Sequence, residues 1–522
     1  MSRRSADESM NETPTLTPAS FREALSPAEL AFEQRRRRVG LVLAPFLFVL
    51  LWVLPMPGLS EKAHHFAAIL AMTVTLWITE AVPLPVSGLL GVALSVMLGV
   101  ESARESLSPF ADHLVFLLVG GFIMAEAIFV HGLNRRLAFT VLSLPWVGAR
   151  PTRVLVAYAC VTAFLSMWVS NTATTALMLP IGLSLLDFLY TRRNPTSRLP
   201  NRNYATALML VTAFAASLGG LGTPIGTPTN LIGMGFLEEQ IGRRISFFQW
   251  VTLAMPILII LMAFTLTNLV RSCPAGIEEI HGGRSFILTE KGRLGPLSGG
   301  ERNVLLVFGL AIILWTLPGF VGLAGATELS TTLAARFPEG IVALFCASML
   351  FFLPTDLSER KPTLVWSQAA RIDWGTVLLL GSGIALGRMA ERTGLSREIG
   401  ESMAGHIPHG SLFVMLLIST LAAVLISETT SNMAAVTMLV PLVISISQGV
   451  GVDPVLPALG ATMGGSLGFM LPVSTPPNAL VYGSGYVPIV RMIRHGLWLD
   501  VAGVIVVVGV LYFLGPLVIA IP

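Results

Sequence analysis

The chain has 522 residues, of which 53% are hydrophobic and only 12% are charged, and its formal net charge is +3. Soluble domains carry roughly 25% charged residues, so this composition excludes a soluble globular protein and predicts a chain that lies mostly in the lipid bilayer. The three cysteines are isolated from one another, which excludes a disulfide-stabilised secreted domain, and no basic stripe indicates nucleic acid as a partner.

The N-terminal segment differs from the rest of the chain. Residues 1–38 are polar, end in four consecutive arginines and are predicted to form a disordered tail. The first apolar run follows at about 39–57 and is long enough to cross a bilayer. Because basic residues favour the cytoplasmic side of a span, we expect the N-terminus in the cytoplasm.

Further apolar runs follow up to the end of the chain. Two of them, 154–190 and 411–447, are about 37 residues long, and polar residues interrupt both near the middle. A helix needs roughly 20 residues to cross the bilayer, so each long run is predicted to form a re-entrant hairpin that enters and leaves on one side. The sequence therefore predicts an all-α polytopic membrane protein with about 11 transmembrane helices and two re-entrant hairpins.

The distribution of basic residues supports this topology. With the N-terminus inside, 25 of the 33 Lys and Arg residues fall in cytoplasmic segments and 8 fall outside. The positive-inside rule requires this bias, and replacing either hairpin by a single span would remove it. We therefore expect a multi-pass protein of the cell (inner) membrane, with a cytoplasmic N-terminus and the C-terminus outside.

Two motifs occur twice, in the same order. FLSMWVSNTATTALMLP at 164–180 aligns with LISETTSNMAAVTMLVP at 425–441 with five of 17 positions identical, and TPIGTPTNLI at 223–232 aligns with LPVSTPPNAL at 471–480. We expect two inverted repeats, 39–270 and 303–522, joined by a cytoplasmic linker at 271–302. In such repeats the ligand site lies near the bilayer midplane.

The repeated motifs are expected to break helices inside the membrane. The Ser-Asn motifs lie at the break of each hairpin, and prolines interrupt two further helices predicted at 205–235 and 455–490. Broken helices expose N–H groups that attract anions, while freed carbonyl groups and Ser, Thr and Asn oxygen atoms suit a hard monovalent cation. The two hairpin tips and the two unwound segments are thus predicted to frame one site.

These hairpin motifs, together with GTPIGTPTN at 222–230 and MLPVSTPPNALVYGSG at 470–485, resemble the divalent anion:sodium symporter family over nearly all of residues 39–522. The resemblance implies an elevator-type homodimer that transports dicarboxylates, citrate or sulfate, with sodium as the coupling ion. It implies two sodium sites, which are formed by Ser166, Ser170, Asn171 and the backbone of Gly226 in the first half, and by Ser427, Thr430, Asn432 and Ser474 in the second. The residues that it implies for the anion are Ser170, Asn171, Thr172, Thr227, Pro228, Ser431, Asn432, Thr475 and Pro476.

The sequence disfavours two other classes of function, an enzyme and a channel. The chain contains no zinc-protease, nucleophile-elbow or phosphate-loop motif, so we do not expect an enzyme. A channel needs a continuous pore, whereas inverted repeats with broken helices favour alternating access by a carrier.

The residue that follows the second Ser-Asn pair bears on the choice of anion. Met433 stands where the first motif has Thr172, so one hydroxyl contact to the anion is expected to be missing. We predict C4-dicarboxylates such as succinate, fumarate and malate, with sulfate symport, tricarboxylate symport and sodium-independent dicarboxylate exchange as alternatives. No Lys or Arg occurs at either tip and no arginine is expected in the site, which favours sodium coupling. Glu428 is expected either to accept a proton or to cap local N–H groups.

Overall fold

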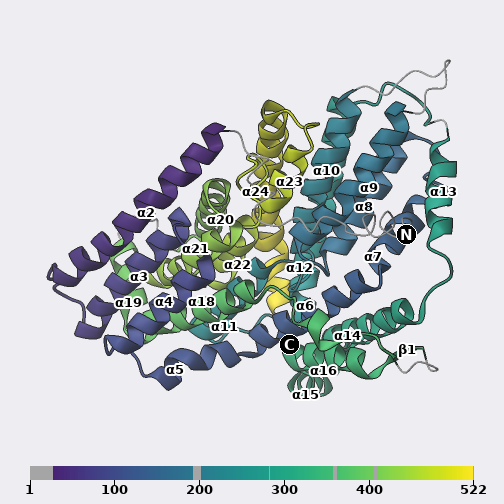
Figure 1. Cartoon of the computed structure of the whole chain (residues 1–522). Coiled ribbons are helices and arrows are strands. Elements are labelled where there is room, and N and C mark those ends of the chain that lie inside the picture. Colours follow the sequence, from purple (N-terminus) through teal and green to yellow (C-terminus); the bar gives the residue numbers. More distant parts are fainter. Residues whose placement is uncertain (1–26, 192–201, 281, 357–360, 405–409, 521–522) are drawn as a thin grey trace, which may run out of the picture.

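The computed structural model describes residues 27–191, 202–280, 282–356, 361–404 and 410–520. These residues are helical almost throughout (Figure 1), and the sheet content of the described ranges is one antiparallel pair, β1 (Pro354–Asp356) and β2 (Lys361–Pro362). The predicted all-α fold class is therefore confirmed.

The N-terminal elements include a first helix that begins earlier than the sequence predicted. They are α2 (Pro27–Val53), α3 (Glu61–Thr79), α4 (Leu84–Met97), α5 (Ala103–Leu107), η1 (Ser108–Ala111), α6 (His113–Val130) and α7 (Leu133–Leu142). The prediction of a disordered tail is wrong for residues 27–38, because Pro27 starts a run of strong helix formers and Arg37 pairs with Glu33 one turn away. The rest of that predicted tail, 1–26, lies outside the described residues.

Both long apolar runs form helix–turn–helix hairpins. Hairpin 1 consists of α8 (Pro151–Ser166) and α9 (Asn171–Thr191), and hairpin 2 consists of α20 (Leu412–Thr429) and α21 (Asn432–Gly449). The turns fall at the polar residues that interrupt the apolar runs, because a serine before each asparagine caps the second arm.

The two proline-containing segments are interrupted as expected. The first consists of α10 (Arg202–Leu221) and α11 (Pro228–Ile241), and the second of α22 (Val455–Gly464) and α23 (Pro476–Gly483). In both, a proline occupies the first position of the later helix, where its missing N–H costs no hydrogen bond. Residues 222–227 and 465–475 are therefore unwound and form the two unwound segments.

The other helices complete the bundle. They are α12 (Phe247–Ser272), α13 (Gly283–Arg293), α14 (Gly299–Leu323), α15 (Thr327–Arg336), α16 (Glu339–Phe352), α17 (Trp366–Ala369), α18 (Trp374–Arg392), α19 (Leu395–Ala404) and α24 (Ile489–Ile519). Eight helices of the described ranges are long and apolar enough to cross a membrane, or nine if α15 and α16 form one bent span. Three of the eight are hairpin arms, so the predicted number of 11 crossings stays a prediction.

Helix packing follows one scheme in both halves of the chain. The first arm of each hairpin packs on the broken helix of its own half, α8 on α10 and α20 on α22. The second arm meets the short helix of the other half, since α9 contacts α23 and α21 contacts α11, while α12 and α24 pack against each other. This reciprocal packing joins the hairpins and broken helices of the two halves; in Figure 1, α8, α9 and α10 stand at the upper right and α20, α21 and α22 in the middle. The boundaries predicted for the two repeats and the linker stay predictions.

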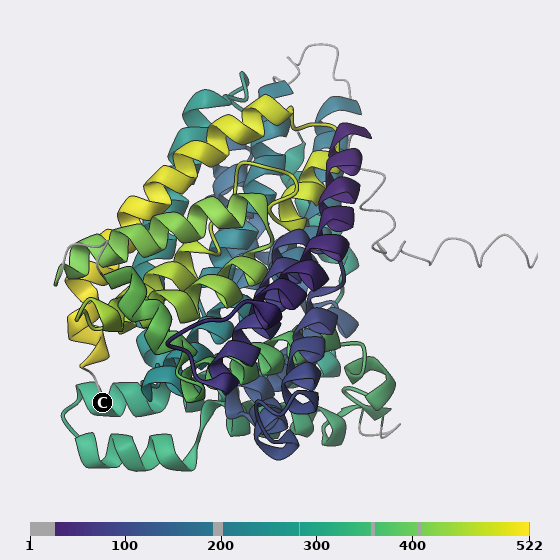
Figure 2. The same ribbon diagram turned by 90° about the vertical axis from the view of Figure 1, so that its left-hand side faces the viewer.

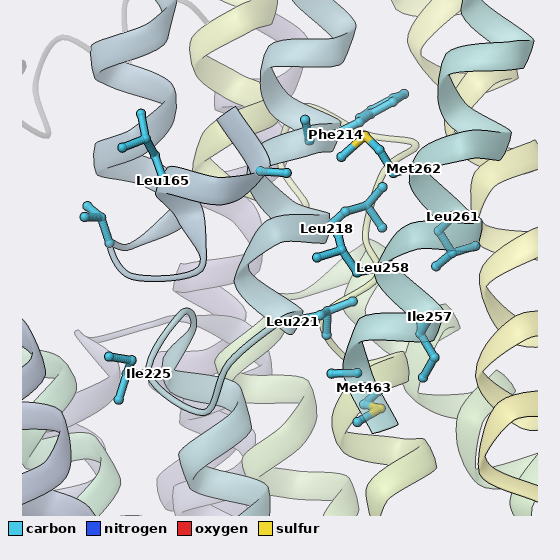
Figure 3. Close-up of a cluster of buried hydrophobic side chains, with 14 of the residues drawn as sticks. Leu165, Phe214, Leu218, Leu221, Ile225, Ile257, Leu258, Leu261, Met262 and Met463 are labelled. Atoms are coloured by element: carbon cyan, nitrogen blue, oxygen red, sulfur yellow. The ribbon is translucent and has the colours of Figure 1, made fainter. Parts of the chain in front are cut away.

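A dense apolar core surrounds the first unwound segment. The core side chains labelled in Figure 3 come from α8, α10, α12, α22 and the unwound segment itself, and are Leu165, Phe214, Leu218, Leu221, Ile225, Ile257, Leu258, Leu261, Met262 and Met463. All of them are buried. Because a close-packed core resists deformation, it holds the unwound backbone of the break in a defined position.

Candidate functional site

A cavity of about 1130 Å³ is lined by the two hairpin tips and the two unwound segments, and also by α6 and the start of α18. Its volume is at the upper end of the range of small-molecule sites in proteins. All the residues that the sequence suggested for the anion line this cavity, namely Ser170, Asn171, Thr172, Thr227, Pro228, Ser431, Asn432, Thr475 and Pro476. The fold thus brings together four segments that are far apart in the sequence.

Four helices begin at the cavity wall. Their first residues are Asn171 of α9, Asn432 of α21, Pro228 of α11 and Pro476 of α23, and all four line the cavity. The first turn of a helix has N–H groups without intrahelical partners and carries the positive end of the helix dipole. Four such ends around one space favour a bound anion without any charged side chain.

The asparagine of each hairpin is held by the same hydrogen bond. Ser166 Oγ donates to Asn171 Oδ1 at 2.8 Å, and Ser427 Oγ donates to Asn432 Oδ1 at 2.7 Å. Both serines are fully buried, whereas both asparagines are half-buried and reach the cavity. Each amide is thereby fixed across the turn of its hairpin.

The serine that precedes each asparagine caps a helix. Ser170 Oγ accepts the N–H of Ala173 at 3.4 Å, and Ser431 Oγ accepts the N–H of Ala434 at 3.3 Å. Such capping is the ordinary structural role of serine at a helix start. A hydroxyl oxygen that accepts this bond keeps a further lone pair, so both serines can still contact a ligand.

Oxygen atoms converge around two glycines in the first half. A Cβ added to Gly220 would lie 2.2 Å from Asn171 Oδ1, and one added to Gly226 would lie 2.6 Å and 3.0 Å from the carbonyl oxygens of Gly220 and Ser166. Only glycine leaves room for this approach of backbone and side-chain oxygen atoms. We call this group, Ser166, Asn171, Gly220 and Gly226, the first oxygen cluster.

A second oxygen cluster has the same layout in the other half. A Cβ on Gly468 would lie 3.2 Å from Ser427 Oγ and 3.3 Å from Asn432 Oδ1, so the space is wider than in the first half. The cluster also contains Ser474, which stands where the first half has Gly226. Thr430 donates its hydroxyl to the carbonyl oxygen of Ile426 at 2.9 Å, so its hydroxyl oxygen keeps both lone pairs and its backbone carbonyl is also available.

Glu428 joins hairpin 2 to the second unwound segment. Its Oε1 accepts the N–H groups of Phe469 and Met470 at 2.6 Å and 2.9 Å, and its Oε2 accepts the Ser474 hydroxyl at 2.7 Å. The carboxylate therefore caps local N–H groups, which is one of the two roles expected for it, and its role as a proton acceptor stays a prediction. Because the Ser474 proton points to Glu428, the Ser474 oxygen keeps its lone pairs for a cation.

Two asparagines that were not assigned a role shape the unwound segments. Asn230 Nδ2 donates to the carbonyl oxygens of Gly220 and Thr223 at 2.9 Å and 2.8 Å. Asn478 Nδ2 donates to the carbonyl oxygens of Gly468 and Leu471, both at 3.0 Å. Both asparagines occupy the same position in the aligned motifs, so the sequence repeat alone could have indicated them.

Charged residues of α6 and of the segment that leads into α18 also line the cavity. No arginine was expected in the site, yet Arg371, between α17 and α18, lines the same cavity as the hairpin tips. Its guanidinium makes no hydrogen bond or ion pair of 4.0 Å or less within the described ranges, and it attracts the carboxylate of Glu126 on α6. The neighbouring Asp373 is engaged in capping α18 through the N–H of Thr376 at 3.1 Å.

Two hairpins and two broken helices that converge on one cavity define a multi-pass membrane protein of the secondary transporter class. A family model described as the sodium:sulfate symporter transmembrane region matches residues 35–521. The chain therefore belongs to the sodium:sulfate symporter family, whose members are transporters and not enzymes, and the family resemblance of the sequence motifs is confirmed.

Individual relatives agree with this assignment. The chain is 34% identical over 488 residues to the sodium-dependent dicarboxylate transporter SdcS of Staphylococcus saprophyticus, with 92% of each chain covered. It is 32% identical over 490 residues to SdcS of Staphylococcus aureus, again with 92% of each covered. The crystal structure of the Alcanivorax borkumensis YdaH transporter matches with a TM-score of 0.53 at 14% identity, over 93% of this chain and 98% of that chain, which is a likeness of fold alone.

Proposed function

We propose that the protein transports divalent anions, foremost C4-dicarboxylates such as succinate, fumarate and malate, across the membrane together with sodium. The observation that carries the proposal is the arrangement of four helix starts and two oxygen clusters around one cavity. The name of the SdcS relatives, sodium-dependent dicarboxylate transporters, supports both the ion and the class of anion.

The anion interacts with the hairpin tips and the unwound segments in this proposal. The carboxylates accept hydrogen bonds from the amides of Asn171 and Asn432 and from the hydroxyls of Thr227 and Thr475, all of which line the cavity. The positive ends of four helices add to this attraction. Arg371, which lines the same cavity, supplies a full positive charge and thereby favours a dianion over a monoanion.

The two oxygen clusters are the proposed sodium sites. Ser166, Ser427 and Ser474 are at most 1% exposed, whereas Asn171 and Asn432 are half-buried at the cavity surface. The cations therefore lie behind the residues that face the anion, and an anion in the cavity would cover them. This geometry supports an order of events in which sodium binds first and contributes positive charge to the anion site.

A membrane orientation with the N-terminus in the cytoplasm and the C-terminus outside, in the cell (inner) membrane, is part of the proposal. Residues assigned to the same side contact one another, which supports it. On the cytoplasmic side, Arg135 pairs with Glu290 at 3.0 Å. On the outer side, Arg392 pairs with Glu101 at 3.3 Å. A homodimer and an elevator movement of the hairpins are proposed on the family resemblance alone.

The decisive experiment is uptake of radiolabelled succinate into proteoliposomes that contain the purified protein, with citrate and sulfate as competitors. We expect saturable uptake that becomes concentrative under an inward sodium gradient and disappears when potassium replaces sodium. Uptake that is unchanged without sodium would contradict the coupling. Uptake that occurs only into liposomes preloaded with dicarboxylate would identify an exchanger, and preferential competition by citrate or sulfate would identify those symporters.

A further inference from the structure

One arginine of the N-terminal helix contacts the tip of hairpin 2. Arg36 of α2 donates from Nη2 to Glu80 Oε2 at 3.0 Å and from Nη1 to the carbonyl oxygen of Thr429 at 3.2 Å. Thr429 is the last residue of α20 and directly precedes Thr430, a proposed sodium ligand. Helix α2, dark purple in Figure 2, lies on the face of the molecule that is turned toward the viewer. The contact thus links an outer helix to the exposed end of α20, one residue before a proposed sodium ligand.

The packing of α2 on α3 explains why Arg36 reaches this position. A Cβ added to Gly40 would lie 2.0 Å from Thr79 Oγ1 and 2.9 Å from Ala81 Cβ, so glycine permits a very close approach of the two helices. Gly40 lies one helical turn after Arg36 and therefore on the same face of α2. Glu80 has a φ of 46° and is the non-glycine residue with positive φ among those described, a conformation that persists only where the surroundings impose it.

The chemistry of the contact suits the end of a helix. The last carbonyl groups of a helix lack intrahelical partners and carry the negative end of its dipole. In the described ranges no backbone N–H donates to the Thr429 carbonyl, so the Arg36 guanidinium is its partner. The Nε–H of Arg36 is buried without a partner, which offsets part of the gain and makes the contact reversible.

Hairpin 1 is held in a different way. Its tip residue Trp168 contacts Phe308 of α14 through an edge-to-face arrangement of the rings, with centroids 6.2 Å apart. That contact is between uncharged rings, whereas the contact of Arg36 at the tip of hairpin 2 joins a charged group to a carbonyl group. The two tips are therefore attached to the surrounding helices unequally.

We propose that Arg36, Glu80 and the Thr429 carbonyl group form a latch. The latch holds the tip of hairpin 2 in the conformation described here, and these contacts break during each transport cycle. Arg36 acts as a positioning residue for the proposed second sodium site. The inference rests on the proposed function, because only a carrier needs its hairpin tip to move against the helices that surround it.

The positioning role is tested by hydrogen–deuterium exchange of the full chain in nanodiscs. In Arg36→Gln we expect the amides of residues 427–434 to exchange about tenfold faster than in the wild type, the effect of losing a hydrogen bond to a charged group, while the amides of 166–173 are unchanged. Arg38→Gln is the matched control, since Arg38 belongs to the same basic run but is exposed and makes no side-chain hydrogen bond or ion pair in the described chain. Glu80→Gln keeps the shape of the latch and should give a smaller increase in the same direction.

Exchange at residues 427–434 that is the same in Arg36→Gln as in the wild type would overturn the latch. This measurement needs no substrate, so it remains decisive even if the protein proves not to transport dicarboxylates.

The opening of the latch is tested by cross-linking. Cysteines at positions 36 and 429 (Arg36→Cys and Thr429→Cys), in a chain whose native Cys160, Cys273 and Cys346 are replaced by serine, are joined by a short thiol-reactive linker that reduction cleaves. We expect succinate uptake to stop on linking and to return after reduction. Linked protein that transports at the rate of the unlinked protein would refute the opening step.

Discussion

Replacement of Asn171 by alanine tests the first proposed sodium site most directly. Asn171 Oδ1 accepts a hydrogen bond from Ser166 Oγ at 2.8 Å and approaches the backbone of Gly220 closely. The substitution removes this oxygen atom and leaves the backbone oxygens of the first cluster in place. Folding should be retained, because Asn171 is the first residue of α9 and alanine is a good helix former.

The size of the effect follows from the loss of one polar partner of a charged ligand. Such an interaction contributes about 1.5–3 kcal/mol. Since about 1.4 kcal/mol corresponds to a factor of ten, the sodium concentration for half-maximal uptake should rise by about 10- to 100-fold. Succinate uptake at ordinary sodium concentrations is then lost, and high sodium should restore part of it. Asn432→Ala should act in the same way on the second site.

The assay is a sodium titration of succinate uptake in proteoliposomes. Asn268→Ala is a matched control, because Asn268 lies on α12 outside the cavity and its amide contacts only the hydroxyl of Ser272, at 3.4 Å, among the described side chains. We expect the control to titrate like the wild type. A sodium requirement of Asn171→Ala that equals that of the control would refute the assignment of this oxygen to a cation.

Three further predictions concern the cavity and its surroundings. Gly220→Ala introduces a Cβ 2.2 Å from Asn171 Oδ1 and should abolish succinate uptake. In Gly468→Ala the nearest atom to the new Cβ is 3.2 Å away, so this variant should retain a large part of the uptake. Equal losses in the two variants would contradict the geometry. Arg371→Gln should raise the KM for succinate about tenfold without changing the sodium titration. Arg371→Lys should recover most of the affinity for succinate. An unchanged KM in Arg371→Gln would exclude a contact with the anion. Met433→Thr should alter the relative inhibition of succinate uptake by citrate and sulfate, because Met433 lines the cavity, and an identical inhibition profile would place its side chain out of reach of the ligand.

The helix breaks at the centre of the molecule were predictable from local sequence. Proline lacks an N–H group and serine caps a helix start, so Pro228 and Ser170 mark interruptions wherever they are placed in the fold. The structure begins α11 at Pro228 and α9 at Asn171, as these rules require. The repeat of both motifs then indicated that four such breaks meet, which the cavity lining agrees with.

Partners of charged side chains were not predictable in this way. The basic run at 35–38 was interpreted only as a topological signal, yet Arg36 contacts Glu80 and Thr429, which is 393 positions away. No arginine was expected in the site, yet Arg371 lines the cavity. Neither contact leaves a periodic pattern in the sequence, because periodicity reports which face of a helix is apolar and not which helix it packs against.

Local backbone chemistry therefore determined where this chain is helical, where it is broken and which oxygen-bearing residues stand at the breaks. Only the tertiary structure decided which charges surround those breaks, because the close approach at Gly40 and the position of Arg371 depend on how separate helices pack. A hydrogen bond within one turn is encoded by adjacent residues. A contact between distant helices depends on how all the side chains between them pack.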